Sequence, residues 1–216
     1  MKSKKLLSYI LPITKTIAST YSGPLEITWH NGKKHLNSKH ANYSYGSLQK
    51  ILKSGIEQVT LQKVNSILVL GMGGGSVIAT LRDDFKYTKS ITAVEIDPVI
   101  IDIADKEFGI SEDDQLQILC MDAFEFVKSH KAQFDLIIID LFIDLSVPEQ
   151  FLSETFWNHV LCLKSSKGDI LFNAAVKDAK RTTIQQLVNY LKTKIYKVEL
   201  FENVNQTNTL ILLKSL

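Results

Sequence analysis

The feature that most constrains the fold is the glycine-rich stretch S-I-L-V-L-G-M-G-G-G-S at residues 66–76. Its first half is an apolar run that is too short to span a membrane and is typical of a strand buried on both faces. Because glycine has no Cβ and tolerates positive φ, the second half can turn tightly and let a ligand lie against the backbone. Residues 77–81 can continue as a helix. Together these features predict a nucleotide-binding corner built on Gly71, Gly73, Gly74 and Gly75.

The spacing of these glycines argues against a dinucleotide ligand. The dinucleotide fingerprint G-x-G-x-x-G would place its third glycine at position 76, where this chain has Ser76. The observed order is G-x-G-x-G, which suits a ligand without a pyrophosphate, since the helix start then need not hold two phosphates. A plain tight turn is the alternative.

Short apolar strands alternate with helices after residue 61, which predicts a parallel sheet covered on both faces. The expected strands are Ser66–Leu70, Ile91–Glu95, Leu116–Cys120, Asp135–Ile139 and Asp169–Asn173. The expected helices are Gly75–Arg82, Val99–Glu107, Ala123–Ser129, Glu149–Leu163 and Ala179–Leu191. Two final strands, Lys197–Phe201 and Thr209–Leu213, are joined too closely for a helix and must be antiparallel. Residues 61–216 are therefore predicted to form an α/β domain: a Rossmann-like, doubly wound, mostly parallel seven-stranded sheet ending in an antiparallel hairpin.

Residues 1–60 are predicted to form a small N-terminal appendage. Leu25–His30 and Lys33–Leu36 can be strands, and Asn31-Gly32 between them is a strong hairpin signal, because both positions of a type I′ turn need positive φ. Apolar residues at helical spacing then predict a helix within residues 45–59.

Composition excludes several classes of function. The chain has 25 basic and 23 acidic side chains, and this balance gives no electrostatic footprint for nucleic acid. No apolar run approaches the length of a membrane span. The basic and then apolar N-terminus resembles a weak signal peptide, but Ser8 and Pro12 interrupt it, so a cytoplasmic protein is expected. Neither the five histidines nor Cys120 and Cys162 show metal-ligand spacing, so we expect no metal and reduced thiols.

Glu95 stands at the end of the second expected strand, 24 residues after Gly71. A carboxylate there can accept both hydroxyls of a ribose that lies across the glycine loop. The alternative is that Glu95 or Asp97 only caps the helix that Pro98 begins. Asp97 suits the capping role better, and Glu95 suits the ribose role better.

Asp122 follows the third expected strand in C-M-D-A-F. Its carboxylate could accept a hydrogen bond from an adenine amine while the N–H of Ala123 serves a ring nitrogen. It could equally cap the helix that begins at Ala123. The preceding glycine loop and Glu95 favour the adenine role.

Asp140 ends the fourth expected strand, F-D-L-I-I-I-D, and Asp144 follows in L-F-I-D. Since the carboxyl ends of strands line the ligand crevice of a doubly wound sheet, Asp140 should face the reactive end of a bound nucleoside. It could orient an amine, accept its proton or bind a cationic substrate. The alternative is a loop aspartate that bonds to the local backbone.

The order of these motifs resembles one family. The matching segments are I-L-V-L-G-M-G-G-G-S, A-V-E-I-D-P, C-M-D-A-F-E-F, F-D-L-I-I-I-D and P-E-Q-F-L-S-E-T-F-W. They look like spermidine synthase and its relatives, within the class I S-adenosylmethionine-dependent methyltransferase superfamily, whose sheet also ends in an antiparallel hairpin. The resemblance covers roughly residues 25–175. Val69 fits it, because aminopropyltransferases typically carry an apolar residue at that position.

The resemblance implies roles for particular residues. The glycine loop would line the donor, Glu95 would hold its ribose, and Asp122 with Ala123 would hold its adenine. Asp140 would match the aspartate that binds and helps to deprotonate the attacking amine. Tyr45, in N-Y-S-Y-G, would match a tyrosine near that amine. A homodimer is a further family expectation.

Two departures leave the transferred group open. The donor loop of the family reads G-G-G-D-G, and its aspartate is replaced by Gly74. The D-S-S-D-P loop of the family becomes D-L-F-I-D, which is one residue longer to the second aspartate, Asp144, and apolar between. The donor is therefore S-adenosylmethionine or its decarboxylated form.

The resulting expectation is a transferase. Methyl transfer to an unidentified small acceptor, with an amine as a candidate, is favoured over aminopropyl transfer in polyamine biosynthesis. A non-catalytic nucleoside-binding relative is an alternative. A nicotinamide-dependent oxidoreductase is disfavoured by Ser76 and the terminal hairpin.

Overall fold

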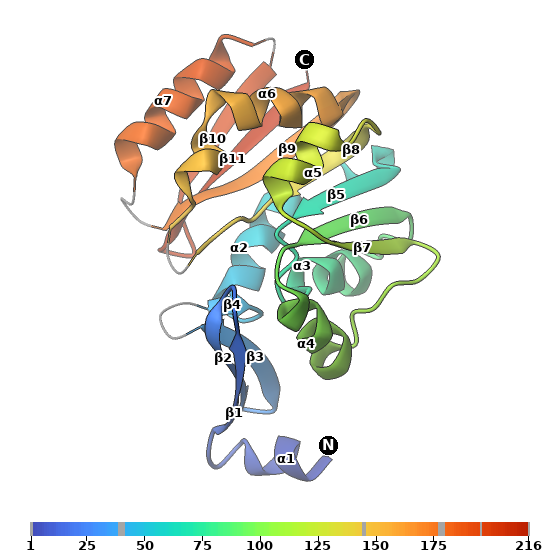
Figure 1. Ribbon diagram of the computed structural model, residues 1–216, viewed down its shortest axis with the longest axis vertical. Coiled ribbons are helices and arrows are strands. Elements are labelled where there is room, and N and C mark those ends of the chain that lie inside the picture. Colours follow the sequence, from blue (N-terminus) through green and yellow to red (C-terminus); the bar gives the residue numbers. More distant parts are fainter. Residues whose placement is uncertain (1, 39–41, 144–145, 177–179, 195, 216) are drawn as a thin grey trace.

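Two β-sheets form in the described part of the chain, which comprises residues 2–38, 42–143, 146–176, 180–194 and 196–215 of the computed structural model (Figure 1). The larger sheet has the strand order β10-β11-β9-β8-β5-β6-β7, and the smaller has the order β1-β2-β3-β4. The strands of the larger sheet are β5 (Ser66–Leu70), β6 (Ser90–Glu95), β7 (Leu116–Cys120), β8 (Phe134–Ile139), β9 (Lys164–Val176), β10 (Tyr196–Val204) and β11 (Asn208–Ser215).

The larger sheet is parallel in its centre and antiparallel at its C-terminal edge. Strand β5 pairs in parallel with β6 and β8, and the parallel pairing extends to β7 and β9. Strand β11 is antiparallel to both β9 and β10. The predicted fold class is therefore confirmed, including the terminal hairpin. Strand β9 begins earlier than expected, at Lys164, because the preceding helix leads directly into it.

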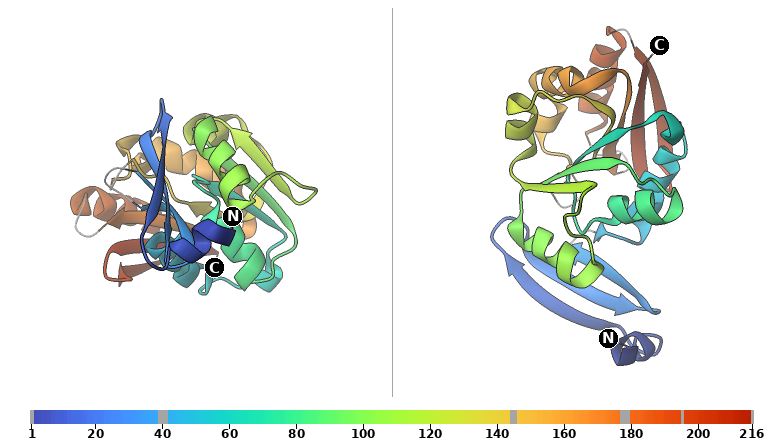
Figure 2. Two further views of the ribbon diagram at one scale, coloured as in Figure 1. Left: turned by 90° about the horizontal axis from the view of Figure 1, so that it is seen from below. Right: turned by 90° about the vertical axis from the view of Figure 1, so that its right-hand side faces the viewer.

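Alternate residues of the central strand face two different cores. Leu68 and Leu70 pack with α5 (Ala123–Ser129), α6 (Glu154–Leu163) and α7 (Arg181–Lys192), whereas Ile67 and Val69 pack with α2 (Ser47–Ile56) and α3 (Ser76–Ala79). Helices α5 and α6 lie on one side of the sheet and α2 and α3 on the other (Figure 2, right). Burial on both faces explains why the sequence of β5 is continuously apolar rather than alternating.

Two predicted helices are interrupted. The expected helix Gly75–Arg82 begins at Ser76, after Gly75 in a left-handed conformation, and changes to a π-helical turn at Thr80–Asp84. The expected helix Glu149–Leu163 divides into a 3-10 turn (Glu149–Leu152) and α6. Ser153 between them is extended, and its hydroxyl accepts the Phe156 N–H at 3.2 Å, so it acts as an N-cap inside the predicted span. The start of the fifth predicted helix, Ala179, lies outside the described residues.

The appendage is a four-stranded antiparallel sheet formed by β1 (Ile13–Ser19), β2 (Gly23–His30), β3 (Lys33–Ser38) and β4 (Asn42–Ser44). The predicted hairpin between β2 and β3 is confirmed, with positive φ at Asn31 and Gly32. Strand β1 was not expected, because it is an edge strand of mostly exposed residues with a weak apolar pattern. The short β4 was not expected either. The boundary near residue 60 stays a prediction; α2, which precedes it, packs with the larger sheet.

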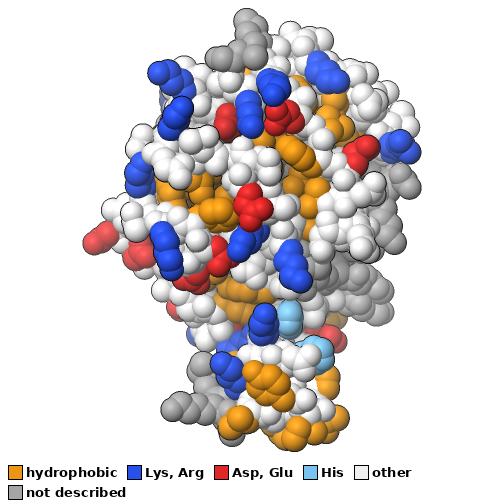
Figure 3. Space-filling view, turned by 180° about the vertical axis from the view of Figure 1, so that it is seen from behind, with side chains coloured by type: hydrophobic (Ala, Val, Ile, Leu, Met, Phe, Trp, Pro, Cys, Tyr) orange, Lys and Arg blue, Asp and Glu red, His pale blue; other side chains and the backbone are white. Residues whose placement is uncertain are grey.

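The N-terminal residues extend the appendage away from the larger sheet. Helix α1 (Lys2–Leu7) lies at this tip (Figure 1). Hydrophobic side chains are exposed at this end of the molecule, and charges of both signs are interspersed over the face above it (Figure 3). The large hydrophobic residues exposed in this segment are Leu6, Leu7, Tyr9, Ile10 and Leu11.

Asp97 joins the two sheets. Its fully buried carboxylate accepts the hydroxyls of Ser19 at 2.5 Å and Ser22 at 2.7 Å, and the Val99 N–H at 2.9 Å. The last of these bonds caps α4 (Pro98–Phe108), as predicted for Asp97. Helix α4 in turn packs Ile100 and Ile103 against the appendage. One side chain therefore fixes the start of α4 and the end of β1 together.

Gly71 fixes the distance between β5 and the strand beside it. Its φ is 85°, and a Cβ at this position would overlap the carbonyl oxygen of Asp140, the residue that follows β8. Gly109, which ends α4 with a φ of 71°, would place a Cβ in open space. The two glycines therefore share a backbone conformation and differ in the room around them.

Replacing Asp97 with alanine should lower the free energy of unfolding by about 2–4 kcal/mol, because a helix cap is lost and two serine hydroxyls lose a buried acceptor. Asp122→Ala, at a more exposed cap, should cost about 1 kcal/mol. Urea unfolding measures both losses. Equal losses would show that the contacts of Asp97 with the appendage contribute nothing to stability.

Gly109→Ala should lower the free energy of unfolding by about 1–2 kcal/mol, the ordinary penalty for an L-residue in the left-handed region. Gly71→Ala should cost roughly twice as much, since the backbone of Asp140 must also move. Thermal or urea unfolding of the two variants side by side gives the comparison. Losses of the same size would mean that β5 and β8 can separate freely at this point.

Candidate functional site

The carboxyl ends of the parallel strands meet at one edge of the larger sheet, the edge that faces the appendage (Figure 1). In a doubly wound sheet this edge is where ligands bind. The polar groups found there come from the loop after β5 and from the ends of β6, β7, β8 and β9. The sequence-predicted residues at this edge are Gly71, Gly73, Gly74, Gly75, Glu95, Asp122, Ala123 and Asp140.

Glu95 ties the glycine loop to the end of β6. Its Oε2 accepts the Gly73 N–H at 2.9 Å, and its Oε1 accepts the Asp97 N–H at 3.1 Å. The side chain is 7% exposed. Burial raises the pKa of the Glu95 carboxyl above its usual range, and hydrogen bonds from the backbone of Gly73, Asp97 and Ile96 oppose that rise. A carboxylate offers about four lone-pair sites, so Glu95 can still accept a hydrogen bond from a ligand.

The appendage packs directly on the glycine loop. A Cβ at Gly74 would lie 3.0 Å from the Cβ of Ser44 and 3.2 Å from a methyl group of Leu36. The Ser44 hydroxyl also accepts the Ser76 N–H at 3.3 Å. A side chain at position 74 would therefore press on β3 and β4, and the side chains of Leu36 and Ser44 would have to shift slightly to admit it.

Asp122 is the N-cap of α5. Its Oδ1 accepts the backbone N–H groups of Phe124 at 2.7 Å and Glu125 at 3.1 Å. Asp122 therefore caps α5, which was the alternative to the adenine role. Because both bonds use the same oxygen, capping leaves Oδ2 for a ligand, and the adenine role stays a prediction. Ala123 is 4% exposed at the first position of the helix.

Asp140 lies at the end of β8 and accepts a hydrogen bond from the first of two linked, buried amides. The Nδ2 group of Asn173 donates to Asp140 Oδ1 at 2.9 Å, and the Nδ2 group of Asn208 donates to Asn173 Oδ1 at 2.8 Å. Asn173 is 0% exposed and Asn208 is 4% exposed. Burial raises the pKa of the Asp140 carboxyl to about 6, and the hydrogen bond from Asn173 opposes that rise.

Neither asparagine was a predicted site residue. Asn173 did carry a signal, because it ends a predicted parallel strand with a polar side chain at the ligand edge. Asn208 carried none, since it belongs to the asparagine-rich segment E-N-V-N-Q-T-N and reaches the site only through the pairing of β11 with β9.

The two remaining predicted residues are not joined to Asp140. The Tyr45 ring stacks on Phe108 of α4 with centroids 4.3 Å apart, and burial raises the pKa of its hydroxyl. Within the described residues no contact links Tyr45 to Asp140, so its role beside an amine stays a prediction. Asp144 lies outside the described residues.

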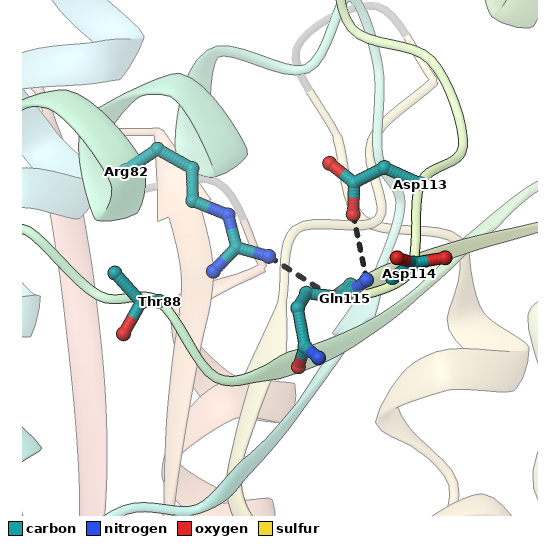
Figure 4. Close-up of a pocket in the computed structure, with 5 residues that line it drawn as sticks. All are labelled: Arg82, Thr88, Asp113, Asp114 and Gln115. Carbon is teal, nitrogen blue, oxygen red and sulfur yellow. Dashed lines mark hydrogen bonds between the residues drawn. The ribbon is translucent and has the colours of Figure 1, made fainter.

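A pocket lies away from this edge, near the starts of β6 and β7. Arg82, Thr88, Asp113, Asp114 and Gln115 line it (Figure 4). Arg82 donates to the Gln115 carbonyl at 3.0 Å, and the Gln115 N–H donates to Asp113 Oδ1 at 2.7 Å. Arg82 also donates to the carbonyls of Tyr87 and Lys89, so these bonds hold the segments that precede β6 and β7, which is a structural role.

Across the described ranges, no group of three or more His, Cys, Asp or Glu side chains is arranged to hold a metal ion. No helix in the same ranges is both long and apolar enough to cross a membrane.

Solved structures share this architecture. A human methyltransferase-like protein 13 in complex with SAH superposes with a TM-score of 0.67 at 21% identity, covering 79% of this chain and 82% of that one. A spermidine synthase in complex with the transition-state analogue AdoDATO gives a TM-score of 0.71 at 15% identity, covering 93% and 73%. At these identities the likeness shows the fold.

Relatives of known sequence carry two kinds of name. An eEF1A lysine and N-terminal methyltransferase homolog from Drosophila melanogaster is 25% identical over 175 residues, which is 76% of this chain and 26% of that protein. A polyamine aminopropyltransferase from Sulfurisphaera tokodaii is 31% identical over 149 residues, which is 65% of this chain and 48% of that protein. The chain thus spans a quarter to a half of the length of these relatives.

The family model described as the spermine/spermidine synthase domain matches residues 49–204. That range contains the glycine loop, Glu95, Asp122, Asp140 and Asn173, and it confirms the resemblance found from the motifs. The relatives are named as methyltransferases and an aminopropyltransferase, so the predicted class, a group transferase, holds for the family. The chain belongs to the spermine/spermidine synthase domain family.

Proposed function

We propose that this protein binds S-adenosylmethionine at the glycine-loop edge and transfers the methyl group to a primary amine held by Asp140. The observation that carries the proposal is Asp140 itself: a partly exposed carboxylate at the ligand edge, anchored by a neutral amide and set in surroundings that raise its pKa to about 6. Such a group can bind an ammonium ion and accept its proton.

The residues of the edge fit the donor. The glycine loop brings backbone close to the ligand space, Glu95 can still accept a hydrogen bond from a ribose hydroxyl, and Oδ2 of Asp122 is free of the capping bonds. Ala123 would offer its N–H to the adenine ring. The donor supplies a methyl group on a sulfonium that needs no further activation.

Asp140 would act on the acceptor. The amine arrives as an ammonium ion and pairs with the carboxylate, which takes one of its protons. The nitrogen lone pair then forms a bond to the methyl carbon as the carbon–sulfur bond breaks, leaving a methylated ammonium. Removing water from the ion pair favours the neutral forms of both partners, so the two pKa values approach each other in the closed site. Positioning supplies the rest of the rate enhancement.

Two features favour methyl transfer over aminopropyl transfer. At position 74 the chain has glycine where the family has an aspartate beside the donor, and Ser44 with Leu36 packs closely against this position. The residues after Asp140, Leu141 and Phe142, are apolar, whereas a diamine needs more than one anionic partner. An acceptor with a single amine suits this site better.

An amine on a protein and an amine on a small molecule are the two candidate acceptors, and one comparison separates them. The relatives named as lysine and N-terminal methyltransferases support a protein amine. The aminopropyltransferase from Sulfurisphaera tokodaii supports the second candidate, aminopropyl transfer from the decarboxylated donor. A panel should therefore contain peptides with free N-termini, lysine peptides, monoamines and putrescine.

The first experiment is calorimetry with S-adenosylmethionine, its decarboxylated form, methylthioadenosine and NAD, followed by transfer of labelled methyl to the panel. Binding of S-adenosylmethionine with methylation of an amine supports the proposal. Spermidine formed from putrescine with the decarboxylated donor would replace it by the second candidate. Binding without transfer to any member would favour a non-catalytic relative, and binding of none of the first three would reject the donor site.

Glu95→Ala should weaken binding of S-adenosylmethionine by about 1–3 kcal/mol, because hydrogen bonds to a charged acceptor are lost and the glycine loop loses its tie. Glu125→Ala, which removes an exposed glutamate from α5, is the matched control and should leave the affinity unchanged. Calorimetric titration gives both dissociation constants. An unaltered affinity in Glu95→Ala would reduce Glu95 to a support for the loop.

Asp140→Asn should lower kcat by about 10²–10⁴-fold while leaving donor affinity within about twofold, since the base is lost and the donor contacts are kept. Its stability should respond to pH. The raised pKa means that the unfolded chain releases this proton at lower pH than the folded chain, so the wild type loses stability as pH rises from about 4 to about 6.

Asp140→Asn has no carboxyl group at this position, so its stability does not fall in this way as the pH rises. The stability advantage of Asp140→Asn should be near zero at pH 4 and reach about 1–3 kcal/mol at pH 7, discounted for the partial exposure of the side chain. Urea unfolding at the two pH values measures the difference. An advantage that does not change with pH would mean that the Asp140 carboxyl titrates at its ordinary pKa.

A further inference from the structure

We infer that Asn173 and Asn208 are positioning residues, which act in series to hold the Asp140 carboxylate in one orientation for the acceptor amine. The inference rests on the proposed function and deepens it, because it assigns a device at the same site. It starts from the two hydrogen bonds that run from Asn208 to Asn173 and from Asn173 to Asp140, at 2.8 and 2.9 Å.

A break in the pairing of β9 and β11 brings Asn173 and Asn208 together. Strands β9 and β11 pair with a break in register: Thr209 lies opposite Ala175, but the next residue, Leu210, lies opposite Asn173. Ala174 is the extra residue, so the pairing contains a β-bulge beside the site. Bulges re-aim side chains near active sites. Here the bulge lies between Asn173 and Val176, the residue that pairs with Asn208. The side-chain amides of Asn173 and Asn208 are therefore hydrogen-bonded although the two residues are not paired in the sheet.

The series fixes which end of the Asn173 amide faces Asp140. An asparagine amide has a donating and an accepting end that are nearly equal in shape. Because Asn208 donates to Asn173 Oδ1, the Nδ2 group of Asn173 must point to Asp140. The opposite orientation would place two donors together at one end and two acceptors together at the other. Asn208 therefore reinforces the orientation in which Asn173 donates to Asp140, without touching Asp140 itself.

The hydrogen bond from Asn173 matters because, in the described part of the chain, no charged side chain shifts the pKa of the Asp140 carboxyl. The causes of the shift are burial, which raises the pKa, and the Asn173 bond, which lowers it. The backbone of Asp140 is held separately, by its N–H to the Leu70 carbonyl at 2.9 Å. Asn173 occupies Oδ1, which leaves Oδ2 as the oxygen that meets the amine.

Both amides are too deeply buried to serve as ordinary surface polar groups. A buried amide without partners is costly, so the pair is tolerated only as a satisfied network. Apolar residues at both positions would pack in the same core without that requirement. The network instead ends on the one carboxylate that the proposed reaction needs, which is the reason for assigning it a positioning role.

The test is a double-mutant cycle in which the measured quantity is the pKa of Asp140. The variants are Asn173→Leu, Asn208→Leu and the combination of both, each labelled with ¹³C at aspartate carboxyl groups. The Asp140 resonance is identified by its loss in Asp140→Asn. Its titration by NMR gives the pKa of Asp140 without any need for activity. Asn189→Leu, an exposed asparagine on α7, is the matched control.

The expected result is an upward shift in the pKa of Asp140 of about one unit in Asn173→Leu and a smaller one in Asn208→Leu. The double variant should match Asn173→Leu, because Asn208 acts only through Asn173. The acid limb of the methyl-transfer profile should move with these shifts, while the affinity for S-adenosylmethionine stays constant. Asn189→Leu should change none of these quantities.

Two results would overturn the inference: an unchanged pKa of Asp140 in Asn208→Leu, or additive shifts in the double variant. If a variant does not fold, the wild-type protein still tests the inference. The side-chain ¹⁵N resonance of its Asn173 should shift with pH at the pKa of Asp140. An Asn173 resonance that does not shift as Asp140 titrates would contradict the series of hydrogen bonds. Correct pKa shifts without methylation of any amine would uphold the series and reject the proposed function, so the two failures are distinguishable.

Discussion

The architecture of the site depends on the buried carboxylate of Glu95. One of its oxygens accepts the N–H of Gly73 and the other that of Asp97, so the glycine loop and the entry to α4 are fixed relative to each other. Two residues later, Asp97 binds Ser19 and Ser22 of the appendage. The segment 95–97 thus connects three parts of the chain, and Ile96 between the two acids is 40% exposed. Two acids this deeply buried are tolerated because backbone and hydroxyl donors satisfy them.

The proposed acceptor half of the site, around Asp140, is built on a different principle. Asp140 is held by a neutral amide rather than by a cation, so its charge is oriented but not neutralised. A lysine or arginine in place of Asn173 would lower the pKa of Asp140 and weaken it as a base and as an ammonium site. A raised pKa destabilises the folded chain above pH 6, which is a cost in stability that a functional carboxylate commonly carries.

Most of the fold could be predicted from the sequence because its signals are local. The continuous apolar run of β5 and the Asn31-Gly32 turn each determine their own conformation. Edge strand β1 and the interruption at Ser153 could not be predicted, since their patterns are weak or are overridden by a cap. In the site, Glu95 and Asp140 were found because they end predicted strands. Asn208 was missed because its place depends on a bulge and on pairing with β9, a non-local property.

The packing of the appendage on the glycine loop bears on why the family can support two chemistries. Position 74, which would lie beside the proposed donor, is covered by Ser44 and Leu36, and a Cβ there would come within 3.0–3.2 Å of their side chains. A carboxylate at that position would therefore need these two side chains to shift, and Ser44 is also the residue that accepts the Ser76 N–H. We therefore expect an aspartate at position 74 to be accompanied by an adjustment of β3 and β4. Such an adjustment would link the proposed choice of donor to a segment that contributes no strand to the larger sheet.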